Sequence, residues 1–407
     1  MMDWTRKLLI LLIMISILET NCFYTLSTRS TTSKSGRTEQ EPSYWPTNGW
    51  RTSTPEEQGV SSIKLEELYG YFNSTLVLRN TLSSMGSLLI IRNGYLIHEN
   101  YFSSYLHGER GLNIYSCTKS ITSTLIGIAL EEGYIGGVED KILSYFPNRT
   151  FQDRDSWKEA MTIEDLLTMR SGLSWDESDY NDPNNDYFQM YSSQNAVQYV
   201  LDKPMTSFPG TSWVYNTGNS HLLSAIIDKT TENGTKEFAQ TRLFNPLGIS
   251  PTGWSLDSQN VPFGGSNLKM KPREMAKFGY LFLQNGTWEG QQLVSQDWIA
   301  AATKQTDTTS FYGYQWWIEP ARYSYSARGY KGQRIVIIPN YDLVIVFTAN
   351  TFADWDLYPI LIDQYIIPAI GYIPQSSTTT ESQRTSFLIF PVILALGTLL
   401  TRRKRTN

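Results

Sequence analysis

Three places in the sequence put a serine three residues before a lysine, a spacing that can support nucleophilic catalysis. A serine hydroxyl is a weak nucleophile until a neighbouring base removes its proton. On a helix, a lysine three residues further along lies one turn away on the same face. Burial favours the neutral amine, which can accept that proton. The three pairs are Ser61–Lys64, Ser116–Lys119 and Ser266–Lys269.

The surroundings of the three serines differ, and they favour Ser116 as the nucleophile without establishing it. Ser61 precedes an amphipathic segment and is typical of a helix N-cap. Ser266 lies in a Gly-Gly-Ser loop before Pro272. Ser116 instead begins a run of small and apolar residues that ends near Glu132. At the start of a helix, backbone N–H groups and the helix dipole stabilise developing negative charge.

The histidines and cysteines offer no competing site. None of His98, His107 and His221 lies in the sequence context of a nucleophile elbow, so we expect structural roles for them. Cys117 is typical of a small buried helix residue, and Cys22 lies at the end of an apolar N-terminal run. No cluster of His, Cys and carboxylates has metal-ligand spacing. We therefore expect neither a metal nor an organic cofactor.

Composition indicates a globular protein with a large core. Of the 407 residues, 41% are hydrophobic and only 18% are charged, so a sizeable core can be buried. The net charge of −5 argues against a nucleic-acid partner, which would favour a basic face. The chain also has 12 Trp, 25 Tyr and 17 Phe, which suits a pocket lined with rings.

The elements around Ser116 predict an α+β fold. Two hairpins are indicated, one at 87–99 around Asn93-Gly94 and one at 333–348. Because they lie at opposite ends of the folded region, we expect one antiparallel sheet built from both. The segment between them is mainly helical. The predicted helices are Ser116 to Glu132, Thr162 to Met169, His221 to Thr231, a helix opened by Pro272 and another capped by Ser295.

Both ends of the chain differ in composition from the middle. Leu8 to Leu18 is an apolar run after Arg6-Lys7, and Phe387 to Leu400 is another that precedes four basic residues. Four Asn-x-Ser/Thr sequons, at Asn73, Asn148, Asn233 and Asn285, agree with an exported glycoprotein. We expect a cell-surface or secreted protein, anchored to a membrane at its C-terminus. The predicted divisions are 1–22, a signal peptide or anchor; 23–43, a linker; 44–374, the folded domain, with its sheet part at 44–115 and 305–374 and its helical part at 116–304; 375–386, a linker; and 387–407, an apolar segment with a basic tail.

The residues around Ser116 resemble the first motif of the serine β-lactamase and penicillin-binding-protein superfamily. The run 113–120 carries this likeness, and it is most similar to the class C-like branch, which holds esterases and aminohexanoate-oligomer hydrolases. Further landmarks follow in family order at 163–173, 209–218, 264–268, 275–279 and 328–333. The resemblance implies a β-lactamase/DD-peptidase-like fold, in which helices flank an antiparallel sheet and a mainly helical domain is inserted.

The resemblance also implies roles for individual residues. Ser116 would be the acylated nucleophile and Lys119 its base partner. Tyr215 would be the second proton-transfer group, with a pKa lowered by the nearby lysine, and would activate the deacylating water. The backbone N–H groups of Ser116 and Gln333 would form the oxyanion hole, with Gly332 permitting close approach.

Two departures from the family pattern narrow the expected substrate. Thr217 holds the position of the usual Asn in the second motif, and Tyr330 holds that of the usual cation in the third. Together with Lys331 and Gly332, these residues are the expected substrate-binding positions. Both departures resemble the esterase and oligomer-amidase side of the family. Three tryptophans are expected either to line the acyl pocket or to pack in the core: Trp175, Trp316 and Trp317.

The sequence thus predicts a serine hydrolase that cleaves a small ester or amide through an acyl-enzyme on Ser116. Two alternatives stay open: a penicillin-recognising D-amino-acid peptidase or β-lactamase, and a catalytically inactive surface-binding protein on the same fold. The expected partners are a small-molecule substrate and a membrane. The sequence does not fix the oligomeric state.

Overall fold

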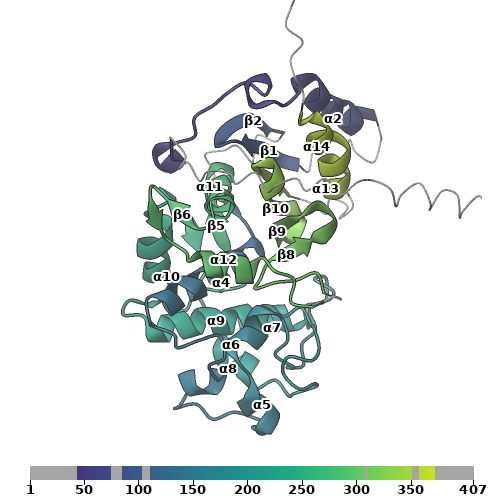
Figure 1. Ribbon diagram of the computed structural model, residues 1–407. Helices are drawn as coiled ribbons and strands as arrows, with labels where there is room; N and C mark the ends of the chain where they lie inside the picture. The colour runs from purple at the N-terminus through teal and green to yellow at the C-terminus, as the bar shows by residue number, and fades with distance from the viewer. Residues whose placement is uncertain (1–43, 75–84, 103–110, 308–309, 351–356, 372–407) are drawn as a thin grey trace, which may run out of the picture.

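A six-stranded antiparallel sheet forms one end of the molecule (Figure 1). A computed structural model of the chain describes residues 44–74, 85–102, 111–307, 310–350 and 357–371. The strand order is β2-β1-β11-β10-β9-β8. The strands are β1 (Met85–Arg92), β2 (Tyr95–Tyr101), β8 (Trp317–Glu319), β9 (Ser324–Gly329), β10 (Gln333–Ile338) and β11 (Leu343–Ala349).

Both predicted hairpins are confirmed, and they share this sheet. The turn between β1 and β2 has positive φ at Asn93 (51°) and Gly94 (77°), which a tight hairpin of this type requires. The chain between β10 and β11 turns through Pro339–Tyr341. β1 pairs antiparallel with β11, so the two hairpins, some 240 residues apart in the chain, lie side by side as expected.

Apolar side chains on both faces hold the sheet between two layers of helices. On one face, Leu88 and Ile90 pack with residues of α2 (Ser62–Ser74) and of the C-terminal helices. On the other face, Leu89 and Ile91 join the main core, where α11 (Pro272–Leu283) covers the sheet. Successive side chains of a strand point to opposite faces, so the continuous apolar runs fit a sheet buried on both sides. The C-terminal helices are α13 (Leu357–Ile360), the π-helix η9 (Leu361–Ile366) and α14 (Ile367–Ala369).

The segment between the two hairpins is mainly helical, as predicted. At its centre, α4 (Cys117–Glu131) packs against α9 (Thr217–Thr230). α11 belongs to this segment in the chain and yet covers the sheet. The remaining helices are α5 (Ser156–Ala160), α6 (Ile163–Leu167), α7 (Asp186–Ser192), α8 (Ala196–Leu201), α10 (Gly234–Ala239) and α12 (Gln296–Ala302). Short strands complete it: β3 (Leu112–Asn113), β4 (Gly253–Trp254), β5 (Leu268–Met270), β6 (Thr287–Trp288) and β7 (Gln291–Gln292).

The predicted helix caps are present, but one helix begins earlier than expected. Thr162 forms a capping box, and the Ser295 side chain accepts from the backbone of its helix. α9 was expected from His221 and begins instead at Thr217, because the Asn216 side chain accepts from the Asn219 backbone N–H and caps it there. This earlier start places the segment around Tyr215 at the N-terminus of a buried helix.

Both terminal segments and the first sequon fall wholly or partly outside the residues whose side chains are described. Asn148, Asn233 and Asn285 are exposed, so each of these sequons is accessible on the surface. Within the described ranges, no helix combines the length and the apolar character needed to cross a membrane.

Two helical glycines give opposite predictions for stability. A Cβ at Gly127 in α4 would lie 2.5 Å from the Trp298 ring, whereas a Cβ at exposed Gly70 in α2 meets nothing within 4 Å. Gly127→Ala should therefore lower the free energy of unfolding by about 1–3 kcal/mol through overpacking. Gly70→Ala should raise it by about 0.5–1 kcal/mol, because alanine costs less backbone entropy in a helix. Urea unfolding measures both, and equal stabilities for the two variants would contradict this packing.

Candidate active site

Ser116 is the N-cap residue of α4 and follows a turn with an unusual backbone. Tyr115, just before it, has φ of 47°, in the left-handed region that bulky residues rarely adopt. The Asn113 side chain stabilises this turn by accepting from the Tyr115 N–H at 2.8 Å. Backbone strain of this kind is concentrated at functional sites. The turn leaves Ser116 partly exposed at the edge of a cavity.

Three oxygen atoms surround the amine of Lys119, which is 1% exposed. Its Nζ lies 3.2 Å from Ser116 Oγ, 2.9 Å from Thr217 Oγ1 and 3.0 Å from the Gly265 carbonyl. The carbonyl can only accept, and the Thr217 hydroxyl already donates to Glu177 at 2.8 Å. When the amine is neutral, its two N–H groups are therefore held by these two oxygens. Its lone pair is left facing Ser116.

Burial also makes this lysine easier to deprotonate. Removal from water lowers the pKa of Lys119 to about 8, because a buried charge loses its hydration. The negative charge of Glu177 opposes this shift and favours the ammonium form. Neutral Lys119 is thus accessible near neutral pH, and its position suits a general base for the Ser116 hydroxyl.

Glu177 is a buried carboxylate at the site that the sequence analysis missed. It is 5% exposed and accepts four hydrogen bonds. Thr217 donates from its backbone N–H and its hydroxyl, both at 2.8 Å; Trp175 Nε1 donates at 2.6 Å and Tyr180 Oη at 2.8 Å. A continuous chain of hydrogen bonds thus runs from Glu177 through Thr217 and Lys119 to Ser116. Glu177 lies in a loop, and the sequence carries no spacing signal that would place this loop against α4.

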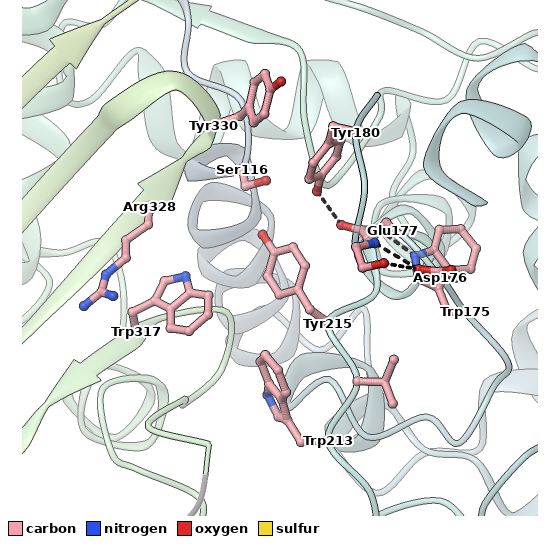
Figure 2. A pocket seen from close by; sticks show the side chains of 12 residues that line it. Ser116, Trp175, Asp176, Glu177, Tyr180, Trp213, Tyr215, Trp317, Arg328 and Tyr330 are labelled. Carbon is pink, nitrogen blue, oxygen red and sulfur yellow. Dashed lines mark hydrogen bonds between the residues drawn. The ribbon is translucent and has the colours of Figure 1, made fainter. Parts of the chain in front are cut away.

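Tyr215 lies beside both members of the Ser-Lys pair. Its hydroxyl points toward Ser116, and its ring centroid is 4.8 Å from Lys119 Nζ (Figure 2). Burial, and then the charge of Glu177, raise the pKa of Tyr215 above its ordinary value. The predicted lowering of this pKa by the nearby lysine is therefore wrong. Tyr215 remains a neutral phenol at physiological pH and can donate a proton or relay one.

The structure brings only part of the predicted third motif to the cavity. Tyr330 lines it, and so does Arg328 of β9, for which no role was predicted. Gly329 lies between them, where a Cβ would come within 2.3 Å of the Ile114 carbonyl. A glycine is therefore needed for the end of β9 to pack against the segment that leads to Ser116.

The other predicted binding residues do not line the cavity. The Gln333 side chain donates to the Ala349 carbonyl at 2.5 Å, and Gly332 accepts from Tyr358 at 3.0 Å. Lys331 is likewise absent from the lining, and the Thr217 hydroxyl is occupied within the hydrogen-bond chain. The chain turns after β9, so Gln333 begins β10, where its backbone carbonyl is 3.7 Å from Cys117 Sγ. The role of its backbone N–H in the oxyanion hole stays a prediction.

The cavity beside Ser116 has a volume of about 390 Å³ and is largely aromatic (Figure 2). Of the three tryptophans considered from sequence, Trp175 and Trp317 line it, whereas Trp316 is fully buried in the core. The lining residues are Ser116, Trp175, Asp176, Glu177, Ser178, Tyr180, Trp213, Val214, Tyr215, Trp317, Arg328 and Tyr330.

The described histidines make structural contacts elsewhere. His98 hydrogen-bonds to Tyr69 at 2.6 Å, and buried His221 pairs with Asp257 at 3.0 Å. His107 lies outside the described residues. Across the described part of the chain, no group of three or more His, Cys, Asp or Glu side chains is arranged to hold a metal ion.

Comparisons with known proteins agree with this architecture. The chain is 24% identical over 285 residues to the 6-aminohexanoate-dimer hydrolase of Paenarthrobacter ureafaciens, covering 64% of this chain and 71% of that one. It is 25% identical over 180 residues to the lovastatin esterase of Penicillium rubens, covering 39% and 42%. The solved structure of EstCE1, a hydrolase with promiscuous acyltransferase activity, superposes with a TM-score of 0.64 at 14% identity, covering 76% and 99%.

A family model described as Beta-lactamase matches residues 85–359. The matched region contains β1, the segment around Ser116, α9 and the remaining strands of the sheet. It spans more than half of the sequence, and the chain therefore belongs to the beta-lactamase family.

Proposed function

We propose that this protein hydrolyses an ester, or a small amide, through a covalent acyl intermediate on Ser116. The observation that carries the proposal is the hydrogen bonding of Lys119, which directs the lone pair of its neutral amine at Ser116 Oγ. The similarity to an esterase and to an amide hydrolase of the same family supports the choice of substrate.

Acylation begins when Lys119 Nζ takes the Ser116 hydroxyl proton and Oγ attacks the substrate carbonyl carbon. The negative charge that develops on the carbonyl oxygen is stabilised by the Ser116 backbone N–H at the start of α4. We propose that a second hydrogen-bond donor to this oxygen lies at the end of β9, which packs against the chain before Ser116. The tetrahedral intermediate then collapses, and the bond to the leaving group breaks.

Proton return completes each half of the reaction. The Tyr215 hydroxyl relays the proton from the Lys119 ammonium to the departing oxygen or nitrogen. This role fits a phenol with a raised pKa, because the Tyr215 hydroxyl donates its own proton only as it receives another from Lys119. In deacylation, water attacks the acyl carbon and gives a proton to Lys119. The Lys119 ammonium then returns this proton to Ser116 Oγ as the acid product leaves.

The two rival functions have less support from the site. A penicillin-recognising enzyme would need a cation for the substrate carboxylate, but Tyr330 holds the expected position. Arg328, the cation nearby, hydrogen-bonds to Glu319 and Ser326. A purely binding protein would not need Ser116, Lys119 and Tyr215 to be linked for proton transfer. We further propose that the enzyme works outside the cytoplasm, on the strength of the apolar terminal segments and the exposed sequons.

The nucleophile is tested with a fluorophosphonate probe and a chromogenic acetate ester. Ser116→Ala should abolish labelling and lower kcat/KM by at least about 10³-fold, because no other group can form the acyl bond. Ser61→Ala is the matched control, since Ser61 has the same spacing to a lysine but caps α2. Labelling that survives Ser116→Ala would refute the assignment. A wild-type protein that neither labels nor hydrolyses would instead favour the binding-protein alternative.

The pH dependence of kcat/KM tests the protonation of Lys119. Because the base must be neutral, activity should rise with pH and level off above an apparent pKa of about 8. Glu177→Gln removes the charge that favours the ammonium form, so the rising limb should move to lower pH, by about one unit. Asp176→Asn is the control, because this neighbouring carboxylate is exposed and does not shift the pKa of Lys119. A limb that moves to higher pH in Glu177→Gln would contradict this electrostatic account.

A further inference from the structure

One wall of the cavity is a continuous set of aromatic rings. The ring centroids of Trp213, Tyr215 and Trp317 lie 6.0–6.2 Å from one another. Buried Tyr312 supports them from behind, 5.0 Å from Trp317 and 5.8 Å from Trp213. Figure 2 shows the rings of Trp213, Tyr215 and Trp317 below Ser116, with Tyr215 between the serine and Trp213. An acyl group bound to Ser116 that extends in this direction meets apolar ring surface.

Hydrogen bonds and ring contacts hold the opposite wall in place. The Trp175 indole and the Tyr180 hydroxyl both donate to the Glu177 carboxylate. The Tyr180 ring in turn contacts Tyr330, with 5.1 Å between centroids. Rings fixed in this way lose little conformational freedom when a ligand binds. The cavity of about 390 Å³ is therefore a preformed apolar site of a size typical for small molecules.

The charged groups of the wall are already engaged with protein partners. Arg328 donates to Glu319 and, at 2.9 Å, to Ser326 Oγ, and its guanidinium lies over Trp317 at 5.1 Å. Figure 2 shows this guanidinium directed away from Ser116. It is thus not placed to receive a carboxylate on the substrate.

The two acids of the wall accept hydrogen bonds from uncharged groups, so the wall presents carboxylates and no free cation. Glu177 accepts its four hydrogen bonds from groups of the protein, and Asp176 accepts from the Ser178 N–H and hydroxyl at 3.0 and 2.7 Å. Lys119 is enclosed by its three oxygens. A carboxylate on the acyl group would therefore lose its hydration in this cavity beside two other carboxylates and without gaining a dedicated cation, which is costly.

We infer that this cavity selects apolar acyl groups, and that it discriminates against acyl chains that carry a carboxylate at the far end. The inference rests on the proposed acyl-enzyme at Ser116 and names the substrate class of that site. The natural substrate is accordingly a neutral apolar acyl ester or amide. An acyl chain that ends in a carboxylate does not belong to this class.

Three p-nitrophenyl esters of equal chain length test the inference: the hexanoate, the 6-aminohexanoate and the adipate monoester. They place a methyl and a carboxylate group at the sixth carbon, counted from the carbonyl, and an ammonium group one bond further. The hexanoate should have a kcat/KM at least about tenfold above the adipate monoester, and above the acetate. The 6-aminohexanoate ester is the control for charge sign, because aromatic rings and the carboxylates of the wall attract an ammonium group, so it should be hydrolysed faster than the adipate monoester. An adipate monoester that equals or exceeds the hexanoate or the 6-aminohexanoate ester would overturn the inference.

Variants locate the selectivity in the aromatic wall. Trp213→Ala should reduce the ratio of hexanoate to acetate kcat/KM by about tenfold, because it removes ring surface that only the longer chain contacts. Trp157→Ala is the matched control, since this exposed tryptophan of α5 does not line the cavity, and its ratio should equal that of the wild type. Fluorophosphonate labelling of both variants shows that each has folded. An unchanged ratio in labelled Trp213→Ala would contradict the assignment.

The acetate ester separates this inference from the proposed function. Hydrolysis of acetate through Ser116 without any preference among the longer esters would reject the selectivity and leave the acyl-enzyme intact. A wild-type enzyme that is unreactive to acetate and to the fluorophosphonate would reject the proposed function itself.

Discussion

The amine of Lys119 is enclosed by oxygens of Ser116, Thr217 and Gly265, and almost no water reaches it. Two of these oxygens must receive N–H groups, so only the direction of Ser116 is open to a lone pair. Desolvation lowers the pKa of this amine toward neutrality, and Glu177 limits how far it falls. The same buried contacts thus set both the direction of the Lys119 lone pair and the pH range in which the amine can accept a proton.

Several distant segments are needed to build this environment. α4 supplies the serine and the lysine on one face, and the early start of α9 at its Asn216 cap positions Thr217. Gly265 brings its carbonyl close because it lacks a side chain: a Cβ there would lie 2.6 Å from Thr217 and 3.2 Å from Lys119 Nζ. The sheet contacts the same site at the end of β9, which packs against the chain before Ser116. The loop that carries Glu177 adds the carboxylate and two of the aromatic rings.

Sequence patterns predicted what depends on local order along the chain. Hairpin turns, apolar periodicity and caps located the sheet and most helices, and the likeness around Ser116 identified the Ser-Lys pair. The failures were non-local. Glu177 reaches the site through a loop contact. The pKa of Tyr215 is raised by burial and by that carboxylate, which is distant in sequence. Which third-motif residues line the cavity depends on where β9 ends. Arg328 and Tyr330 line the cavity, whereas Lys331 and Gly332, in the turn after β9, do not. None of these is encoded by spacing alone.

The central claim is that burial makes Lys119 a base near neutral pH, and NMR titration of its side chain tests it most directly. Protein labelled with ¹³C and ¹⁵N at lysine gives one signal for each side chain, and Lys119→Met assigns the relevant one. The account predicts a titration midpoint of about 8 for Lys119 in the free enzyme. A midpoint near the ordinary lysine value of about 10.4 would contradict it, because the amine would then be almost fully protonated when the enzyme works.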